Sequence, residues 1–260
     1  MSKKYANIYD LLEKTGYKPP VCAVCGVEHE QGDPDTDVQY NELADAYQCR
    51  AHYNVWMYDY ETMQRRKHPE NYMPVYGISR SDAKDCGFDN WQEVDARYTM
   101  LRSRFEEIAS MDRPGRYLFT GDPGNGKTHL LRSIIKYRVQ NVLLARSMYY
   151  IDFDDFSSAF KVSYKKYSKD TEASIMARFT SYDLLIVDDF GQPSSLTDNN
   201  IRLFKMLMDH REKKDNIFST NLENYAAIKE AMGWPIENRF TSYHWIQNKL
   251  ESYRAKIKLL

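Results

Sequence analysis

One short motif, residues 121–128, constrains the fold of this chain more than any other part of it. These residues read GDPGNGKT and fit the pattern G-x-x-x-x-G-K-[ST]. Glycines let the backbone curl so that successive N–H groups can point at phosphate oxygens. Lys127 is then placed to reach the β- and γ-phosphates of a nucleotide, and the Thr128 hydroxyl to hold Mg²⁺. Because the dipole of a following helix adds positive potential, the motif requires a strand before the loop and a helix after it.

The flanking residues supply this setting. Residues 116–120 read RYLFT and predict a short buried strand. Residues 128–139 read THLLRSIIKYRV, in which apolar residues recur at helical spacing. The alternative, a glycine-rich turn with a chance Lys-Thr, does not explain this order of elements. We therefore expect a phosphate-binding loop.

A second motif lies downstream in YDLLIVDDFG, residues 182–191. Leu184 to Val187 form an apolar run that is typical of a central parallel strand. Asp188 and Asp189 follow at its carboxyl end, where open α/β sheets bind ligands. Asp188 fits the carboxylate that holds Mg²⁺ together with Thr128, and Asp189 fits a catalytic base or water-positioning group. The predicted nucleotide contacts are Gly121, Asp122, Pro123, Gly124, Asn125, Gly126, Lys127, Thr128, His129 and Asp188.

Strand-like and helix-like segments alternate from residue 88 to the C-terminus. A helical period over 88–109 leads into this part of the chain. Such alternation predicts an α/β fold with a five-stranded parallel sheet and helices on both faces. The expected strands are 117–120, about 142–145, 184–187, about 216–220 and about 243–246.

Length and charge exclude several classes of protein. The 260 residues allow one large domain, or an ordinary domain with a small one. The net charge of −1 means that any contact with DNA is a local patch rather than a global field. The sequence has no run of about 18 apolar residues and no secretory signal, so we expect a cytoplasmic protein without a membrane partner.

Paired metal-ligand types occur near the N-terminus. Cys22 and Cys25 form C-x-x-C, and Cys49 and His52 form C-x-x-H, with 23 residues between the pairs. Two such pairs predict a structural Zn²⁺ site, in which His29 is a competing fourth ligand. Unrelated thiols beside a surface histidine are the alternative. The predicted domains are a zinc-binding domain at 1–55, a linker at 56–87 that lacks a clear period, and a nucleotide domain at 88–260.

The helix predicted at about 153–167 carries both aromatic and basic residues. Asp152 can cap it, and three phenylalanines form an apolar stripe. Cations that follow phosphates and rings that stack on bases suit single-stranded DNA. On the residues alone, an amphipathic helix with a solvated lysine face is the better interpretation. The candidate DNA contacts are Lys161, Tyr164, Lys165 and Lys166.

Residues 88–260 resemble the replicative helicase loaders of bacteria and phages, the DnaC/DnaI type within the AAA+ ATPases. The resemblance rests on FDNW, GDPGNGKTHL, YDLLIVDDFG, FSTN, IENRF and ESYR, all present in this order. Transposition helper ATPases of the IstB type share most of these motifs. The zinc-like N-terminal region fits loaders whose small N-terminal domain carries zinc and grips the helicase.

The resemblance implies further roles. Asn221 falls at sensor 1 and would orient the attacking water, Arg239 at the arginine finger for a neighbouring subunit, and Arg254 at sensor 2. The lysine-aromatic helix lies where this family contacts single-stranded DNA. Many AAA+ proteins have Asp-Glu where this chain has Asp188-Asp189, so we expect weak hydrolysis of ATP. The segment available for a C-terminal lid, about 222–240, is short, which predicts a reduced lid.

These observations predict an ATP-dependent loader that binds a helicase hexamer through its N-terminal domain and delivers it to single-stranded DNA. It would assemble head to tail, and its divergent N-terminal region suggests a phage origin. One alternative is a transposition helper that acts on duplex DNA. Another is a nucleotide-gated adaptor that hardly hydrolyses ATP. A small-molecule kinase is the weakest alternative, because no acceptor pocket is evident in the sequence.

Overall fold

The computed structural model describes residues 38–41, 46–49, 60–141, 147–164 and 168–252. The chain divides into two compact units, Met1–Gln64 and Arg65–Leu260. In the smaller unit, strands β1 (Val38–Asn41) and β2 (Ala46–Cys49) pair antiparallel.

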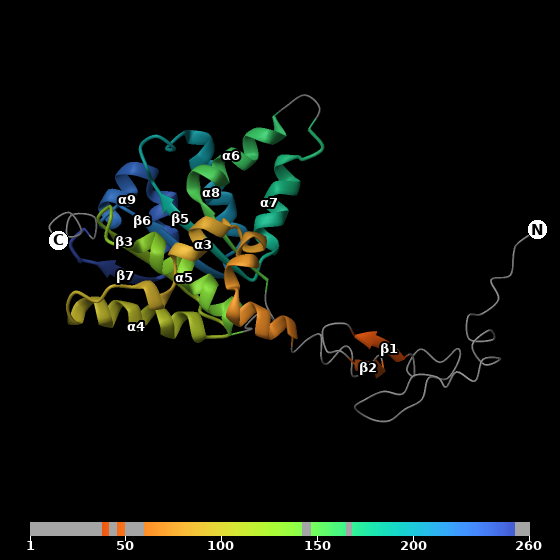
Figure 1. Cartoon of the computed structure of the whole chain (residues 1–260). Coiled ribbons are helices and arrows are strands. Elements are labelled where there is room, and N and C mark those ends of the chain that lie inside the picture. Colours follow the sequence, from red (N-terminus) through yellow and green to blue (C-terminus); the bar gives the residue numbers. More distant parts are fainter. Residues whose placement is uncertain (1–37, 42–45, 50–59, 142–146, 165–167, 253–260) are drawn as a thin grey trace, which may run out of the picture. The chain divides into compact units, whose positions relative to one another are not determined.

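The larger unit is built on a parallel sheet of five strands in the order β4-β5-β6-β3-β7 (Figure 1). The predicted α/β fold with a five-stranded parallel sheet is therefore confirmed. The second strand in chain order is Met148–Asp152, whereas the range of about 142–145 predicted for it lies outside the described residues. The strands are β3 (Arg116–Gly121), β4 (Met148–Asp152), β5 (Leu184–Phe190), β6 (Asp215–Thr220) and β7 (His244–Asn248).

Side-chain caps begin most of the helices of this unit. Asp152, Thr171, Thr197 and Asn224 each accept a hydrogen bond from a backbone N–H in the first turn of the helix that follows. Residues 60–67 are also helical. The α-helices are α3 (Arg80–Asp85), α4 (Ala96–Ser110), α5 (Lys127–Gln140), α6 (Phe153–Ser163), α7 (Glu172–Ser181), α8 (Asp198–His210), α9 (Tyr225–Met232) and α10 (Trp234–Phe240). The 3₁₀ helices are η1 (Pro69–Asn71), η2 (Met73–Tyr76) and η3 (Phe88–Asn90).

Both faces of the sheet are buried, and alternate residues of each strand enter different cores. In β5, Leu184 and Ile186 pack with α4 and α5, whereas Leu185 and Val187 pack with helices α6 to α10 (Figure 1). A strand covered on both sides is apolar throughout, which is why the run at 184–187 predicted this strand correctly.

The helical segment predicted over 88–109 is divided. Residues 88–90 form η3, and α4 begins only at Ala96 because Asp95 accepts a hydrogen bond from the backbone N–H of Arg97. Trp91 lies between the two helices and is buried. The helical spacing of Trp91 thus reflects burial rather than helix.

Residues 69–86, which lie within the predicted linker at 56–87, contribute to the core of the larger unit. Met73, Ile78, Ala83 and Cys86 are buried in the same cluster as α5. Gly77 approaches the edge strand so closely that a Cβ atom there would lie 2.0 Å from the carbonyl oxygen of Tyr150. This segment therefore covers the sheet beside β4.

Residues 222–240, predicted as lid, form the connection between β6 and β7. They contain α9 and α10, whose Ile228, Met232, Ile236 and Phe240 are buried in the core on one face of the sheet. The assignment of this segment to a lid is wrong, because its apolar residues pack on the sheet itself.

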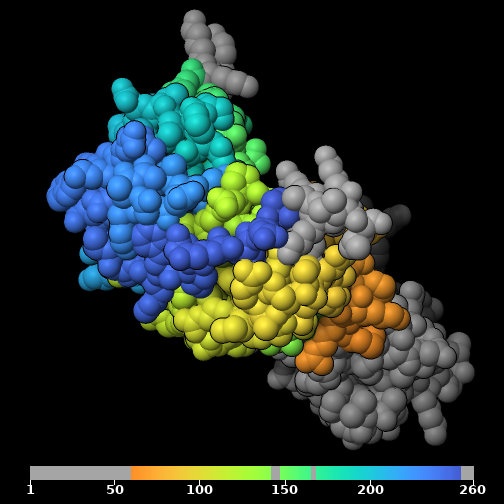
Figure 2. All heavy atoms as spheres, turned by 90° about the vertical axis from the view of Figure 1, so that its left-hand side faces the viewer, coloured from red at the N-terminus to blue at the C-terminus, as the bar shows by residue number. Residues whose placement is uncertain are grey.

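The segment that follows β7 lies along α4. Figure 2 shows these parts of the chain, in blue and yellow, adjoining on one face of the larger unit. The Tyr98 hydroxyl of α4 donates a hydrogen bond to the carbonyl oxygen of Glu251 at 3.3 Å, and Leu250 is buried in the core that contains Tyr98. No helix in the described parts of the chain is both long and apolar enough to cross a membrane.

Arg211 ties the ends of several elements together, opposite the carboxyl edge of the sheet. Its guanidinium is fully buried, and burial lowers its pKa to about 10. Its hydrogen-bond acceptors are the carbonyl oxygens of Phe179, Tyr182, Asp183 and Asp215 and the side-chain oxygen of Asn216. The hydrogen bonds to Phe179, Asp215 and Asn216 are buried, so water does not readily replace the arginine at these oxygens.

We predict that Arg211→Met lowers the free energy of unfolding by about 3 kcal/mol or more, because buried acceptors that lose their donor cost about 1–3 kcal/mol each. Arg202→Met is the control, since Arg202 is exposed and pairs with Glu172 at the surface, where such pairs contribute about 1 kcal/mol or less. Urea unfolding of both variants measures the difference. Equal losses in the two variants would contradict the prediction.

Candidate nucleotide-binding site

The loop between β3 and α5 is held by the strand beside it. Asn125 and Asn248, at the end of β7, exchange hydrogen bonds between side-chain amide and backbone carbonyl, at 3.3 and 2.9 Å. Gly126 has a φ of 89°, and a Cβ atom there would lie 2.6 Å from the Trp91 ring. Only glycine fits this position, because the backbone is left-handed and the indole fills the space.

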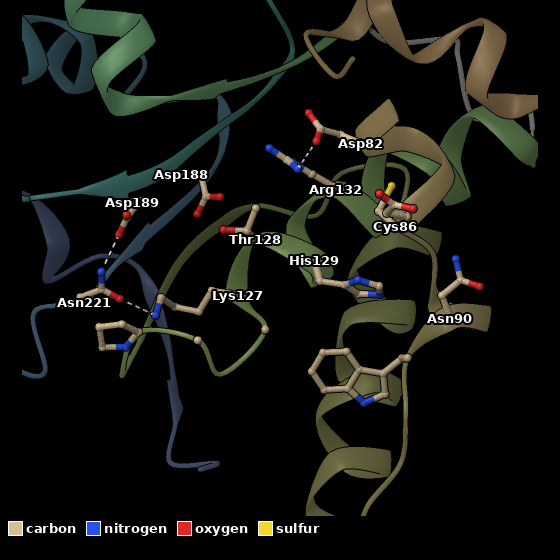
Figure 3. Close-up of a pocket in the computed structure, with 15 residues that line it drawn as sticks. Asp82, Cys86, Asn90, Lys127, Thr128, His129, Arg132, Asp188, Asp189 and Asn221 are labelled. Carbon is tan, nitrogen blue, oxygen red and sulfur yellow. Dashed lines mark hydrogen bonds and ion pairs between the residues drawn. The ribbon is translucent and has the colours of Figure 1, made fainter. Parts of the chain in front are cut away.

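Lys127 lies at the centre of the site. Its amino group donates hydrogen bonds to the carbonyl oxygens of Gly121 at 2.6 Å and Asp122 at 2.9 Å, and to the side-chain oxygen of Asn221 at 2.6 Å. Asn221 in turn donates to Asp189 at 2.7 Å (Figure 3). The structure thus brings together the predicted loop lysine, the predicted sensor 1 residue and the predicted catalytic carboxylate.

A backbone irregularity places both aspartates of the second motif in this pocket. In a regular strand, Asp188 and Asp189 would point to opposite faces of the sheet. The pairing of β5 with β6 shifts register between Val187 and Phe190, and Asp189 has a φ of 55°. This left-handed conformation is uncommon outside glycine, although aspartate tolerates it better than most residues. The bulge redirects Asp189, so that both carboxylates line the pocket.

Burial changes the proton affinity of the central groups. It lowers the pKa of Lys127, while the nearby carboxylates of Asp189, Asp188 and Asp122 oppose this change. Burial also raises the pKa of Asp189, against the hydrogen bond that Gln192 donates to it at 2.8 Å. Opposite charges therefore lie close together in surroundings with restricted access to water.

The pocket around these residues has a volume of about 420 Å³. Six of its lining residues were not among those predicted from the sequence. Five of them precede the loop, and Arg132 lies one turn into α5. Arg132 follows Thr128 by four residues, a spacing that places both side chains on the same face of a helix and is visible in the sequence. The missed residues are Asp82, Asp85, Cys86, Asn90, Trp91 and Arg132. The predicted residues that line the pocket are Pro123, Gly124, Gly126, Lys127, Thr128, His129, Asp188, Asp189 and Asn221.

The residues of the pocket fit a nucleotide with Mg²⁺. The Thr128 hydroxyl and the Asp188 carboxylate offer the hard oxygen ligands that Mg²⁺ takes, and Lys127 supplies a cation for phosphate oxygens. His129, whose pKa burial lowers, has Nε2 2.8 Å from the carbonyl oxygen of Gly87 and its ring 5.7 Å from that of Trp91. Trp91 and His129 thus form an aromatic wall beside the loop.

Arg239, one of the two predicted catalytic arginines, is not among the described residues that line this pocket. Arg239 lies on α10, where it donates hydrogen bonds to Asp209 and to the carbonyl oxygen of Pro235. Arg254 lies outside the described residues. Their predicted roles stay predictions.

The predicted DNA contacts are only partly described. Lys161 is exposed in the last turn of α6, and Tyr164, which follows the helix, is 57% exposed. The Tyr164 hydroxyl donates to Glu172 at 3.3 Å and accepts from Asn199 at 3.2 Å. Lys165 and Lys166 lie outside the described residues. The phenylalanine stripe of α6 is part of the core.

The zinc prediction falls almost wholly on residues that the structure does not describe. Cys22, Cys25, His29 and His52 lie outside the described residues, and only the backbone of Cys49 is described, at the end of β2. The described residues contain no cluster of three or more His, Cys, Asp or Glu side chains that could hold a metal. The zinc site therefore stays a prediction.

Comparison with known proteins identifies relatives of this chain. The family model "Bacterial DnaA ATPase domain" matches residues 102–241, more than half of the chain. The replicative helicase loader DnaC of Buchnera aphidicola subsp. Acyrthosiphon pisum is 25% identical over 181 residues, which are 67% of this chain and 71% of the relative. The predicted resemblance to DnaC-type AAA+ loaders is confirmed.

Two solved structures share the fold. The crystal structure of the DnaC helicase loader has a TM-score of 0.55 at 17% identity and covers 64% of this chain and 98% of that chain. AMPPCP-bound DnaA from Aquifex aeolicus has a TM-score of 0.52 at 19% identity, covering 66% of this chain and 53% of that chain. At these identities the comparison establishes a shared α/β fold alone.

Asp152 makes stability depend on pH. It caps α6 and pairs in register with Asp188 across the sheet. Burial raises its pKa to about 6, and the charges of Asp188, Asp154 and Asp189 add to this effect. Because the folded-state pKa lies above the ordinary value, folding favours the protonated carboxyl. Its contribution to stability therefore falls as pH rises from about 4 through about 6.

We predict that Asp152→Asn, which keeps a capping side chain, is more stable than wild type at pH 8. After allowance for solvent screening of this half-exposed group, the gain is on the order of 1 kcal/mol. The gain should vanish near pH 4. Urea unfolding without nucleotide or Mg²⁺ at the two pH values measures it, and a gain that does not depend on pH would contradict the prediction.

Proposed function

The chain belongs to the family of the bacterial DnaA ATPase domain, and on this premise we propose that it is an ATP-dependent replicative helicase loader. The observation that carries the chemistry is the meeting of Lys127, Asp188, Asp189 and Asn221 in one pocket. They come from the carboxyl ends of β5 and β6 and from the start of α5, which is the edge where parallel sheets bind ligands.

Each of these residues has a part in hydrolysis. Lys127 and the loop N–H groups bind the phosphates, and Thr128 and Asp188 hold Mg²⁺, which neutralises charge that develops on the phosphate oxygens. Asp189 accepts a proton from the attacking water. Asn221, which donates a hydrogen bond to Asp189 at 2.7 Å, orients that water. Since aspartate is shorter than the glutamate of many AAA+ proteins, turnover is weak.

Assembly completes the site. Arg239 forms an ion pair with Asp209 and is not one of the residues that line the pocket. Its action on a γ-phosphate therefore requires the pocket of a neighbouring copy, in a head-to-tail oligomer. Arginine fingers of this kind contribute about 10³–10⁵ in rate. Arg254 acts on the nucleotide of its own subunit.

The loader role is supported by the relative named for it, which matches over two thirds of this chain. The N-terminal unit would bind the replicative helicase hexamer, with Zn²⁺ held by Cys22, Cys25, Cys49 and His52. Single-stranded DNA would bind beside α6 at Lys161, Tyr164, Lys165 and Lys166. With a net charge of −1, such a local basic patch is the way for this chain to contact phosphates.

We predict that substitutions at two residues of the pocket change ATP binding and ATP turnover separately. Lys127→Ala weakens ATP binding, because a cation at the phosphates is lost. Asp189→Asn keeps ATP affinity within a few-fold and lowers turnover by about 10²-fold, the usual effect of losing a catalytic base. Asp198→Asn, an exposed position in the first turn of α8, is the control. Equilibrium binding and phosphate release in the presence of single-stranded DNA measure both effects. ATP binding without DNA-stimulated turnover in the wild-type chain, and unchanged in Asp189→Asn, would favour a nucleotide-gated adaptor.

The loader proposal is tested by native mass measurement of the chain mixed with its host's replicative helicase. ATP and single-stranded DNA are each included or omitted. A discrete complex of a helicase hexamer with several copies of this chain is expected. Absence of a complex under every condition, together with filaments on duplex DNA, would replace the loader by a transposition helper.

A further inference from the structure

Asp188 is held from both sides by hydroxyl groups of the neighbouring strands. The Tyr150 hydroxyl on β4 donates to Oδ2 of Asp188 at 2.7 Å, and the Ser219 hydroxyl on β6 donates to Oδ1. Because β5 lies between β4 and β6, the two hydroxyls hydrogen-bond the carboxylate from the strands on either side of it. Asp188, Tyr150 and Ser219 are 2%, 3% and 0% exposed, so water does not compete for these bonds.

The chemistry of the surrounding groups fixes the direction of both hydrogen bonds. The Tyr150 oxygen accepts from Nε of Arg132 at 3.3 Å, and the Ser219 oxygen accepts from the backbone N–H of Asp189 at 2.9 Å. A guanidinium and a backbone N–H donate and cannot accept. Each hydroxyl has a single proton, which therefore goes to Asp188. The carboxylate meets two donors whose orientation is set before any ligand arrives.

Arg132 is itself held in place. Its guanidinium lies over the Tyr150 ring, 5.3 Å from the centroid, and forms an ion pair with Asp82 of α3 at 3.2 Å (Figure 3). These contacts hold in place the Arg132 side chain, which donates a hydrogen bond to the Tyr150 hydroxyl oxygen. The support of Asp188 thus extends from the sheet to α3.

We propose that Tyr150 and Ser219 are positioning residues that orient the Asp188 carboxylate for Mg²⁺. The inference rests on the proposed function, in which Asp188 holds the metal. Two fixed donors occupy one lone pair on each oxygen and stop rotation of the carboxylate, which leaves the remaining lone pairs for the cation. Hydrogen bonds of this kind to a metal ligand contribute about 10- to 100-fold in metal affinity.

Tyr150→Phe tests this role, because it removes the hydroxyl and keeps the ring. The readout is the Mg²⁺ concentration that half-saturates binding of a fluorescent ADP analogue to the full chain. We expect that concentration to rise about 10-fold or more. We also expect wild-type affinity for the analogue at saturating Mg²⁺ and in EDTA, which a general loss of structure would not preserve.

Tyr149→Phe is the matched control, since Tyr149 is the preceding residue of β4. It is partly buried, packs against the core on the opposite face and stacks on Tyr182 with 4.9 Å between ring centroids. Ser219→Ala provides a second variant should Tyr150→Phe not fold. Its control is Ser157→Ala, which removes a buried hydroxyl that has no hydrogen-bond partner among the described residues.

A wild-type Mg²⁺ requirement in Tyr150→Phe, or in Ser219→Ala if the first variant does not fold, would overturn the inference. That result differs from failure of the proposed function itself. If the proposed function itself were wrong, the wild-type chain would show no Mg²⁺-dependent binding of the analogue.

Discussion

The hydrogen bonds that run from Lys127 through Asn221 to Asp189 join parts of the chain that are far apart in sequence. They connect the start of α5, the end of β6 and the bulge of β5 at one edge of the sheet. A buried lysine is stable only when carbonyl, amide and carboxylate oxygens surround it. The loop and the end of β6 supply oxygens directly to Lys127, and Asn221 connects them to the bulge, so the positions of these three parts depend on one another.

A regular scaffold carries this irregular edge. The sheet is covered on both faces by apolar cores. At the opposite end of the strands, Arg211 donates hydrogen bonds to α7, to Tyr182 before β5, and to β6. Strain is located at Asp189, whose left-handed backbone the surrounding contacts maintain. Such local strain persists only where neighbouring structure determines it, and functional sites are where it accumulates.

The sequence predicts the elements whose pattern is local, and it fails where tertiary contacts decide. The loop motif and the apolar run at 184–187 located β3, α5 and β5. The edge strand β4 was misplaced because its aromatic, polar sequence MYYID is less apolar than the preceding VLLA. Residues 69–86 lacked a period because 3₁₀ turns and one short helix produce none. The bulge at Asp189 and the hydrogen bonds that hold Asp188 depend on partners 30 to 38 positions away along the chain.

The central claim is that these edge groups form one site for Mg²⁺ and ATP. Hydrogen–deuterium exchange of the whole chain, with and without Mg²⁺ and a non-hydrolysable ATP analogue, tests it most directly. The account predicts slower exchange in residues 121–132, 184–191 and 219–222, and in 82–91, which form the far wall of the pocket. Unchanged exchange in these segments, or protection confined to the surroundings of Arg239, would contradict it.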